Sequence, residues 1–262
     1  MTTTLSAAVE GIGYWSRGLP SWCAARAFAV DGVASTDAPT RPAPQLLAPN
    51  ERRRAPESVA VALEVALAAC TAAERDPASL PSVFASTYGD LSITDYMCST
   101  LASQPHSVSP TRFHNSVHNA AAGYWTIGAG AMQPATAISA FDATFAQGLL
   151  EAMVQLAVGS EAVLLVGYDS GASGPLARVS CSEGLLGAAL VLSRLPRDGL
   201  PQLRITLDDG HVGHGDGALA RRDHANAMAQ MLPLFDALAD GRPRAVLKAG
   251  PGRVLRVEIG HA

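Results

Sequence analysis

Charge is scarce in this chain of 262 residues. Charged side chains make up 16% of the sequence against 48% for hydrophobic ones, and Lys248 is the only lysine. Such an apolar composition excludes a disordered tail protein and indicates a compact domain with a large core. The net charge is −4, and the only basic cluster is Arg52, Arg53 and Arg54. Nucleic acid is therefore not expected as a partner, because phosphate binding rests on many Lys and Arg contacts.

Paired cysteines, long apolar runs and a secretion signal are also missing. Cys23, Cys70, Cys98 and Cys181 lie far apart with no CxxC pair, which is typical of reduced thiols in the cytoplasm. No run approaches the roughly 18 apolar residues of a membrane helix, and residues 1–10 lack the basic start and apolar core of a signal peptide. We therefore expect a cytoplasmic protein without a membrane partner.

The common catalytic and cofactor motifs are absent as well. The sequence has no GxSxG and no HExxH, and no glycine-rich phosphate loop precedes Lys248. Gly11 and Gly13 form a GxG that lacks the third glycine of a dinucleotide fingerprint. We expect no cofactor.

Hydrophobic periodicity predicts alternating helices and buried strands, and hence an α/β domain with helices on both faces of its sheet. A Pro- and Arg-rich stretch, residues 35–58, is predicted to be an irregular surface connection with Arg52–Arg54 in a solvated turn. The predicted helices cover residues 56–70, 92–102, 142–158 and 221–239, the last of them interrupted by Pro233. The predicted strands cover residues 82–86, 162–166, 187–192, 203–207, 245–248 and 254–259.

Two histidine pairs are candidate polar sites. His114 and His118 are four residues apart, so a helix would place both on one face, as a metal pair requires. No Cys or acid follows at ligand spacing, and we favour hydrogen bonding at a helix start or a packed surface over a metal site. His211 and His214 are surrounded by Gly and Asp, which predicts a solvent loop. We expect no bound metal.

Three segments are distinctive: SPTRFHNSVHNAAAGYW (residues 109–125), PATAISAFDATFAQGLL (residues 134–150) and EAVLLVGYDS (residues 161–170). Over roughly residues 80–195 the chain resembles the N-terminal half of β-ketoacyl synthases, which have the thiolase-like fold. The order of elements is most similar to the short synthase-like subunits of aryl polyene and xanthomonadin-type pigment clusters, which are type II fatty acid and polyketide pathways. The resemblance implies that residues 1–262 form a single thiolase-like layered α/β/α domain, one half of a ketoacyl synthase.

Two departures from the family pattern decide the functional interpretation. Family members carry roughly Thr-Ala-Cys-Ala-Ser around the nucleophile, and the matching residues 140–144 read AFDAT, with Asp142 at the cysteine position. Complete synthases also supply two histidines, or a His and an Asn, from a second half that we expect 262 residues to be too few to build. A thiol at a helix N-terminus is activated by the helix dipole, whereas an aspartate there is expected to cap the helix and contribute about 1 kcal/mol.

The resemblance therefore implies a non-catalytic subunit of the chain-length-factor type. Such a subunit forms a heterodimer with a catalytic β-ketoacyl-ACP synthase, shapes the acyl tunnel of that partner, and meets the acyl carrier protein indirectly. The strand at residues 136–140 would pair across the two-fold axis, and residues 117–130 would lie along the interface, with Tyr124 and Trp125 as a floor that limits chain extension. The expected interface and tunnel residues are Phe113, His114, Asn115, His118, Asn119, Tyr124, Trp125, Thr136, Ile138, Phe141, Asp142 and Phe145.

Three alternatives stay open at this stage. Phe113, Trp125, Phe141 and Phe145 could fill the chain's own core instead of an interface, because aromatic residues at such spacing usually do. The chain could be a stand-alone enzyme on acyl or malonyl carrier thioesters, with Asp142, His114 or Cys98 supplying the chemistry. It could also be a metal-binding module that uses His114 and His118.

Overall fold

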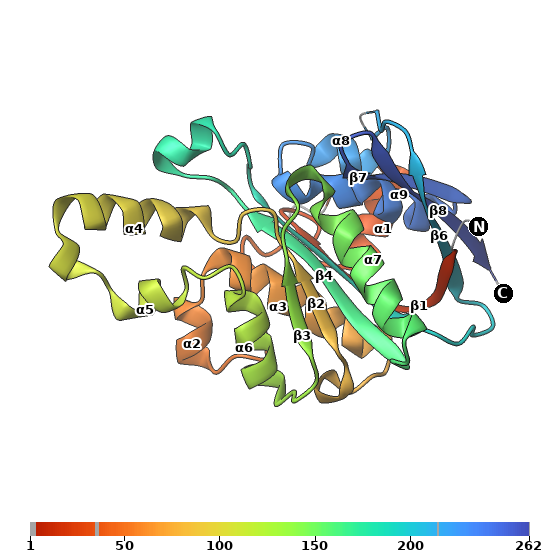
Figure 1. The fold of residues 1–262 in the computed structure, drawn as a ribbon, viewed down its shortest axis with the longest axis horizontal. Coiled ribbons are helices and arrows are strands. Elements are labelled where there is room, and N and C mark those ends of the chain that lie inside the picture. The colour runs from red at the N-terminus through yellow and green to blue at the C-terminus, as the bar shows by residue number, and fades with distance from the viewer. Residues whose placement is uncertain (1–3, 35–36, 214, 262) are drawn as a thin grey trace.

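A computed structural model describes residues 4–34, 37–213 and 215–261. Within these residues eight strands form one mixed sheet in the order β3-β2-β4-β5-β1-β6-β8-β7 (Figure 1). The strands are β1 (Leu5–Ser16), β2 (Ser82–Ala85), β3 (Ala135–Ile138), β4 (Ala162–Ser170), β5 (Leu185–Ser193), β6 (Pro201–Asp209), β7 (Arg244–Gly250) and β8 (Arg253–His261). Strands β3, β2 and β4 run parallel, and the remaining pairs are antiparallel.

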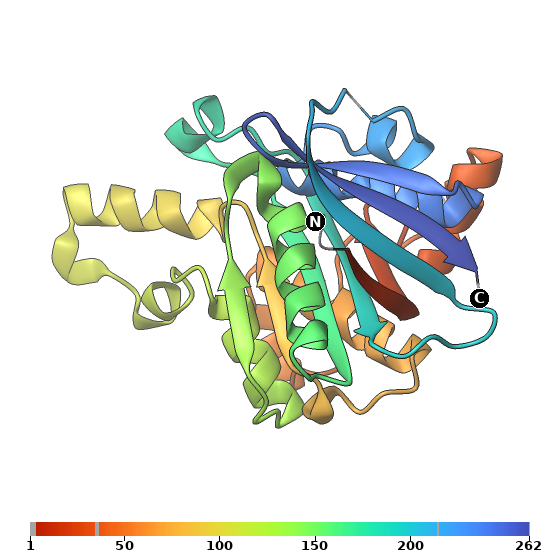
Figure 2. The same cartoon turned by 45° about the vertical axis from the view of Figure 1, so that its right-hand side comes forward.

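Helices cover both faces of the sheet, which confirms the predicted layered α/β/α architecture (Figures 1 and 2). Helices α3 and α6 pack on one face, while α1, α7 and α9 pack on the other. The α-helices are α1 (Trp22–Asp31), α2 (Pro49–Arg54), α3 (Glu57–Ala72), α4 (Leu91–Ser103), α5 (Pro110–His114), α6 (Ala120–Ala129), α7 (Thr144–Ala157), α8 (Ala218–Arg222) and α9 (Leu232–Asp240). Short 3₁₀ turns include η2 (Pro105–Ser107), η3 (Phe141–Ala143), η4 (Gly174–Arg178) and η5 (Ala227–Met231).

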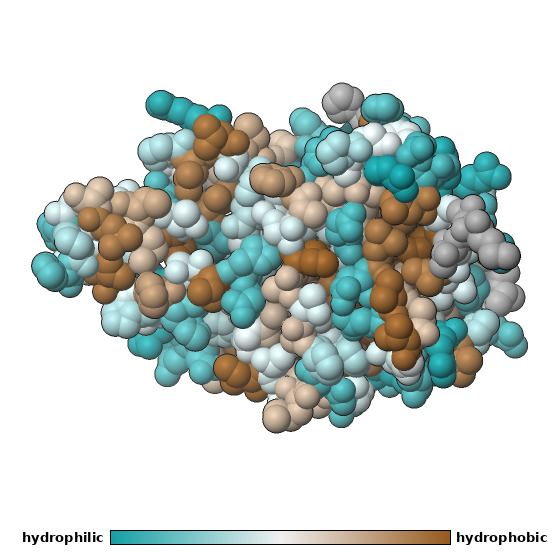
Figure 3. Space-filling model, in the orientation of Figure 1, coloured by the Kyte–Doolittle hydropathy of each residue, from teal (hydrophilic) through white to brown (hydrophobic). Residues whose placement is uncertain are grey.

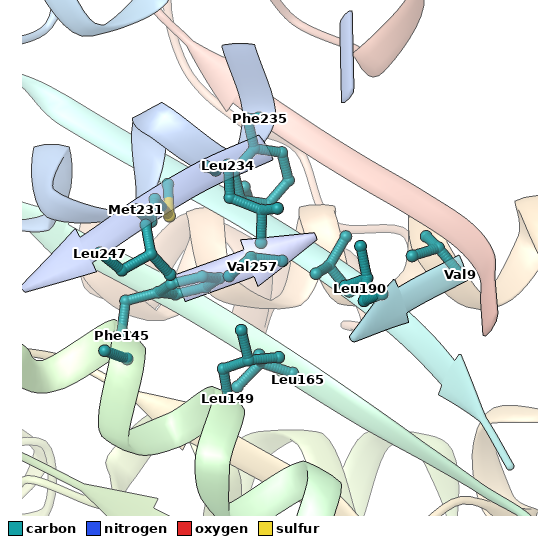
Figure 4. Close-up of a cluster of buried hydrophobic side chains, with 14 of the residues drawn as sticks. Val9, Phe145, Leu149, Leu165, Leu190, Met231, Leu234, Phe235, Leu247 and Val257 are labelled. Carbon is teal, nitrogen blue, oxygen red and sulfur yellow. The ribbon is translucent and has the colours of Figure 1, made fainter. Parts of the chain in front are cut away.

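Strand β4 contains the continuous apolar run of residues 162–166, which predicted a buried strand, and its side chains are buried on both faces of the sheet. Val163 and Leu165 point into the core beneath α7, and Leu164 and Val166 point into the core beneath α3. Because side chains alternate between faces, a strand covered on both sides needs apolar residues at every position. Figure 4 shows Leu165 meeting α7 through Leu149, within the cluster that also holds Phe235 of α9.

The glycines of β1 have a structural role. A side chain on Gly11 or Gly13 would overlap the α3 backbone at Ala69 or Val65, respectively. Glycine at both positions therefore lets the long helix α3 lie directly against the centre of the sheet. Strand β1 itself was not predicted from the sequence.

Two predicted segments are corrected by the structure. The stretch at residues 35–58, of which residues 35–36 lie outside the described residues, contains helix α2, so Arg52–Arg54 end a helix and do not form a turn. The predicted helix at residues 221–239 is three shorter pieces, α8, η5 and α9. Asn226 accepts a hydrogen bond from the Met228 backbone and starts η5, and Pro233 lies in the first turn of α9.

Helices α4 and α5, joined by η2, project from the body as an arm, which is most visible at the left of Figure 1. The hydropathy surface in Figure 3 shows hydrophobic residues on this arm and a second hydrophobic stripe beside α7. Val154 of α7 and Val158, the residue that follows α7, are exposed.

Candidate functional site

The candidate site begins at β3, the outer strand of the sheet. Ser82 and Ser86 donate their backbone N–H groups to the carbonyls of Pro134 and Ile138. Because alternate residues of a strand face opposite neighbours, the N–H and C=O groups of Ala135 and Ala137 point away from β2. Within the described residues no further strand pairs with this edge. The edge is therefore open to pairing by another chain.

After β3 the chain turns sharply into α7. The prediction that Asp142 caps this helix is wrong. Asp142 lies in η3, one turn before α7, and the N-cap position of α7 is Ala143, which has no side-chain acceptor. Thr144 satisfies the turn instead, because its hydroxyl accepts from the Ala140 N–H at 2.9 Å and donates to the Phe141 carbonyl at 2.6 Å. The Asp142 carboxylate faces solvent and forms an ion pair with the only lysine, Lys248 of β7.

Phe141 has a left-handed backbone, with φ of 51°, and its side chain is 75% exposed. A non-glycine residue in this region is strained, and such strain gathers at functional turns. Gln230 of η5 stabilises the turn. Its amide nitrogen donates hydrogen bonds to the carbonyls of Phe141 and Ala227 at 2.9 and 3.0 Å. Sequence reasoning missed Gln230 and Lys248, since neither is close to the turn in sequence.

A buried carboxylate anchors the neighbouring loop. Asp169, at the end of β4, is 1% exposed and accepts hydrogen bonds from the Ser86 hydroxyl at 2.7 Å and from the Thr87 and Tyr88 N–H groups at 2.9 and 3.2 Å. Burial raises the pKa of Asp169 to about 6 from an ordinary value of 3.8, although these hydrogen bonds lower it. The Ser139 hydroxyl binds the Thr87 carbonyl, so this loop also supports the end of β3.

The raised pKa of Asp169 predicts a specific pH dependence of stability. Between pH 3.8 and about 6 the folded protein holds a proton that the unfolded chain has released, so this group adds stability as the pH falls. Between pH 7 and pH 5 the free energy of unfolding gains about 1 kcal/mol from this group. The variant Asp169→Asn loses this gain because asparagine does not titrate. Urea unfolding measures the free energy of unfolding of the parent protein and of Asp169→Asn. The amount by which the variant is less stable than the parent should be about 1 kcal/mol larger at pH 5 than at pH 7. A deficit that is equal at the two pH values, or smaller at pH 5, would contradict this prediction.

A groove of about 520 Å³ lies between α2, α5 and α6. It brings together four of the predicted site residues, Phe113, His114, Asn119 and Tyr124. The rings of His114 and Tyr124 meet edge to face at 6.1 Å. Small residues form part of the groove wall as well, since Ala120, Gly123 and Gly128 line it.

Exposed apolar side chains are concentrated in the segment that contains this groove and β3. Five large hydrophobic residues between positions 113 and 141 are more than half exposed: Phe113, Val117, Ile127, Met132 and Phe141. Exposed apolar clusters of this kind mark interaction surfaces. We call these five residues, together with the outer edge of β3, the β3 surface.

Trp125 and Phe145 lie elsewhere, and the expectation that they face a partner is wrong. Trp125 is fully buried on the opposite side of α6, where its ring lies 6.3 Å from Phe84. Phe145 is fully buried under β4 and lies 6.0 Å from Phe235. Both point toward the sheet because α6 and α7 pack on it at these positions, so the alternative of a core role holds for these two aromatics.

The histidines have separate environments. His114 is the last residue of α5 and His118 lies beyond it, so the two do not share a helix. The His118 ring Nε2 is 2.8 Å from the Ser86 carbonyl. In the described part of the chain no three His, Cys, Asp or Glu side chains gather as metal ligands. His211 is exposed in a loop, as predicted, while His214 lies outside the described residues.

The remaining predicted site residues lie around the same region. Asn115 is buried beneath α5 and faces away from the groove. Thr136 and Ile138 are half-buried in β3 and turn their carbonyls toward β2. The four cysteines are free thiols, and none of the described helices has the length and apolarity to span a bilayer.

Solved structures that match this architecture include ketosynthases and complexes of ketosynthases with chain length factors. The structure of the ketosynthase ApeO in complex with its chain length factor ApeC from Xenorhabdus doucetiae contains a chain that matches with a TM-score of 0.76 and 22% identity, over 97% of this chain and 99% of that one. The ishigamide ketosynthase/chain length factor matches with a TM-score of 0.69 and 13% identity, over 98% of this chain and 99% of that one. A β-ketoacyl synthase from Burkholderia phymatum STM815 matches with a TM-score of 0.57 and 14% identity, over 93% of this chain and 72% of that one. The fold is thus the ketosynthase fold.

The sequence model described as "Beta-ketoacyl synthase, N-terminal domain" matches residues 22–251. This chain therefore belongs to the β-ketoacyl synthase N-terminal domain family. No curated protein matches it.

Proposed function

We propose that this protein is a non-catalytic, chain-length-factor-like subunit that forms a heterodimer with a catalytic β-ketoacyl-ACP synthase and shapes the acyl tunnel of that synthase. The observation that carries the proposal is the Asp142–Lys248 ion pair at the turn where the family places its nucleophilic cysteine. The acyl intermediate of a synthase is a thioester on the cysteine sulfur, and the carboxylate of Asp142 has no sulfur with which to form it.

The β3 surface supports the second part of the proposal, association with a synthase. It combines an unpaired strand edge with exposed aromatic and aliphatic residues, which is the composition of interface cores. Structures that share the fold include two described as ketosynthases together with their chain length factors. The expected pathway is of the type II polyketide, fatty acid or aryl polyene kind, with the carrier protein meeting the assembled pair.

The stand-alone enzyme is the competing function, and acylation separates the two. The chain alone and the chain co-expressed with the catalytic synthase of its pathway are incubated with acyl carrier thioester, and intact masses are recorded. We expect a one-to-one complex in which only the synthase cysteine gains the acyl mass, because this chain has no thiol at the turn. Acyl transfer onto the isolated chain at the rate of synthase turnover would contradict the proposal.

A matched control is the triple variant Cys23→Ser/Cys98→Ser/Cys181→Ser, since these three cysteines are exposed. Slow, nonspecific acylation of exposed thiols disappears in this variant, whereas acylation of a functional group at Asp142 or His114 persists. The single variant Cys98→Ser shows whether Cys98, the third group considered for a stand-alone enzyme, accounts for any fast acylation.

A further inference from the structure

A second pocket, separate from the groove, lies between α2, α4 and α5 and measures about 620 Å³. We call it the arginine pocket. Its polar lining is formed by Arg54 of α2, Ser92 of α4, the α5 cap Ser109, and Thr111, Arg112 and Asn115. A pocket of this volume has room for a small molecule.

Its positive charge is uncompensated. In the part of the chain that the structure describes, neither Arg54 nor Arg112 has a carboxylate within 4.0 Å. The nearby Asp90 uses its oxygens for the hydroxyls of Ser58 and Ser92 and for the Ile93 N–H. Two free guanidinium groups at one pocket favour an oxyanion, and phosphate above all, because its oxygens match the guanidinium donors.

Arg112 is held in place by its neighbours. Its guanidinium lies over the Tyr96 ring, 4.1 Å from the centroid. The Tyr96 hydroxyl in turn accepts a hydrogen bond at 3.0 Å from the Ser109 N–H, so α4 and α5 are joined at the pocket. A side chain stacked in this way loses less freedom when a ligand binds, which strengthens the interaction.

Asn115 also lines the pocket, but its side-chain oxygen Oδ1 is closed off from solvent, so a ligand in the pocket does not contact that atom. The two arginines therefore select the ligand, which is an oxyanion.

We propose that the arginine pocket binds a phosphate group, free or as an ester, through the guanidinium groups of Arg54 and Arg112. This site goes beyond the proposed heterodimer and does not depend on it. The phosphate can belong to a free metabolite or to a phosphate ester borne by another protein, and both present the same chemistry.

Isothermal titration calorimetry on the full chain at constant ionic strength tests the proposal with glycerol 1-phosphate, inorganic phosphate and glycerol. We expect saturable binding of glycerol 1-phosphate and of inorganic phosphate, and no binding of glycerol. Arg54→Gln and Arg112→Gln should each weaken binding by about 10- to 100-fold, the effect of losing a charged hydrogen bond. Arg53→Gln is the matched control, since Arg53 lies on the same helix but bonds Asn50 and does not line the pocket. A phosphoserine peptide separates a protein-borne ester from a free one: binding as tight as that of glycerol 1-phosphate supports a protein-borne source.

Several outcomes would overturn the proposal. They are the absence of saturable binding of either phosphate, saturable binding of glycerol, or an equal loss of affinity in Arg53→Gln. Binding of free glutamate as tight as that of glycerol 1-phosphate would assign the pocket to a partner's carboxylate instead. All three arginines are exposed, so the variants are expected to fold, and circular dichroism checks this.

Discussion

Ala137→Pro should weaken the association of this protein with the proposed partner, a catalytic synthase, by about 100-fold. Ala137 directs its N–H to the open side of β3, so proline removes a donor from the proposed inter-subunit ladder. The lost backbone hydrogen bond and the unpaired carbonyl left on the partner together cost about 3 kcal/mol of binding free energy. This cost corresponds to a roughly 100-fold loss of affinity. Surface plasmon resonance with the immobilised synthase measures it.

The stability of the isolated chain should change little, because the ladder to β2 runs through Thr136 and Ile138, which keep their backbone groups. Ala137→Ser is the matched control: it changes the side chain, keeps the N–H and should bind like the parent protein. Binding of Ala137→Pro within twofold of the parent would exclude β3 as the pairing strand.

Phe145→Ala should lower the free energy of unfolding by about 3–5 kcal/mol, the usual range for removing a buried phenylalanine. The Phe145 ring is fully buried and packs against Phe235 and the backbone of Gly167, where even a methyl group would collide with it. Figure 4 shows it pointing from α7 toward Met231 and Leu247. Urea unfolding at pH 7 measures the loss.

Phe141 lies four residues earlier, in η3, and provides the comparison with Phe145. Its side chain is 75% exposed, so Phe141→Gly removes no core contact, and glycine accepts the positive φ without strain. We expect this variant to unfold with a free energy equal to or slightly above that of the parent, while binding the synthase more weakly because Phe141 belongs to the β3 surface. If Phe141→Gly lost as much stability as Phe145→Ala, Phe141 would be a core residue.

The elements that the sequence predicted correctly are those whose signal is local. Strand β4 could be predicted because a strand buried on both faces must be apolar throughout, and α7 because its apolar positions recur at helical spacing. Strand β1 was missed because Gly11 and Gly13 weaken a local strand signal. Those glycines are explained only by the backbone of α3, which is far from them in sequence.

The candidate site divides in the same way. The amino-acid sequence by itself determined the family resemblance and the position of Asp142 in place of a cysteine, since both depend on residue identity and order. Only the tertiary structure decided that Asp142 binds Lys248 instead of capping α7, that Phe141 faces solvent while Phe145 is buried, and that Arg54 and Arg112 share a pocket. The physical reason is that burial, charge pairing and pocket formation depend on which distant segments pack together, whereas helix and strand periodicity depends on neighbours along the chain.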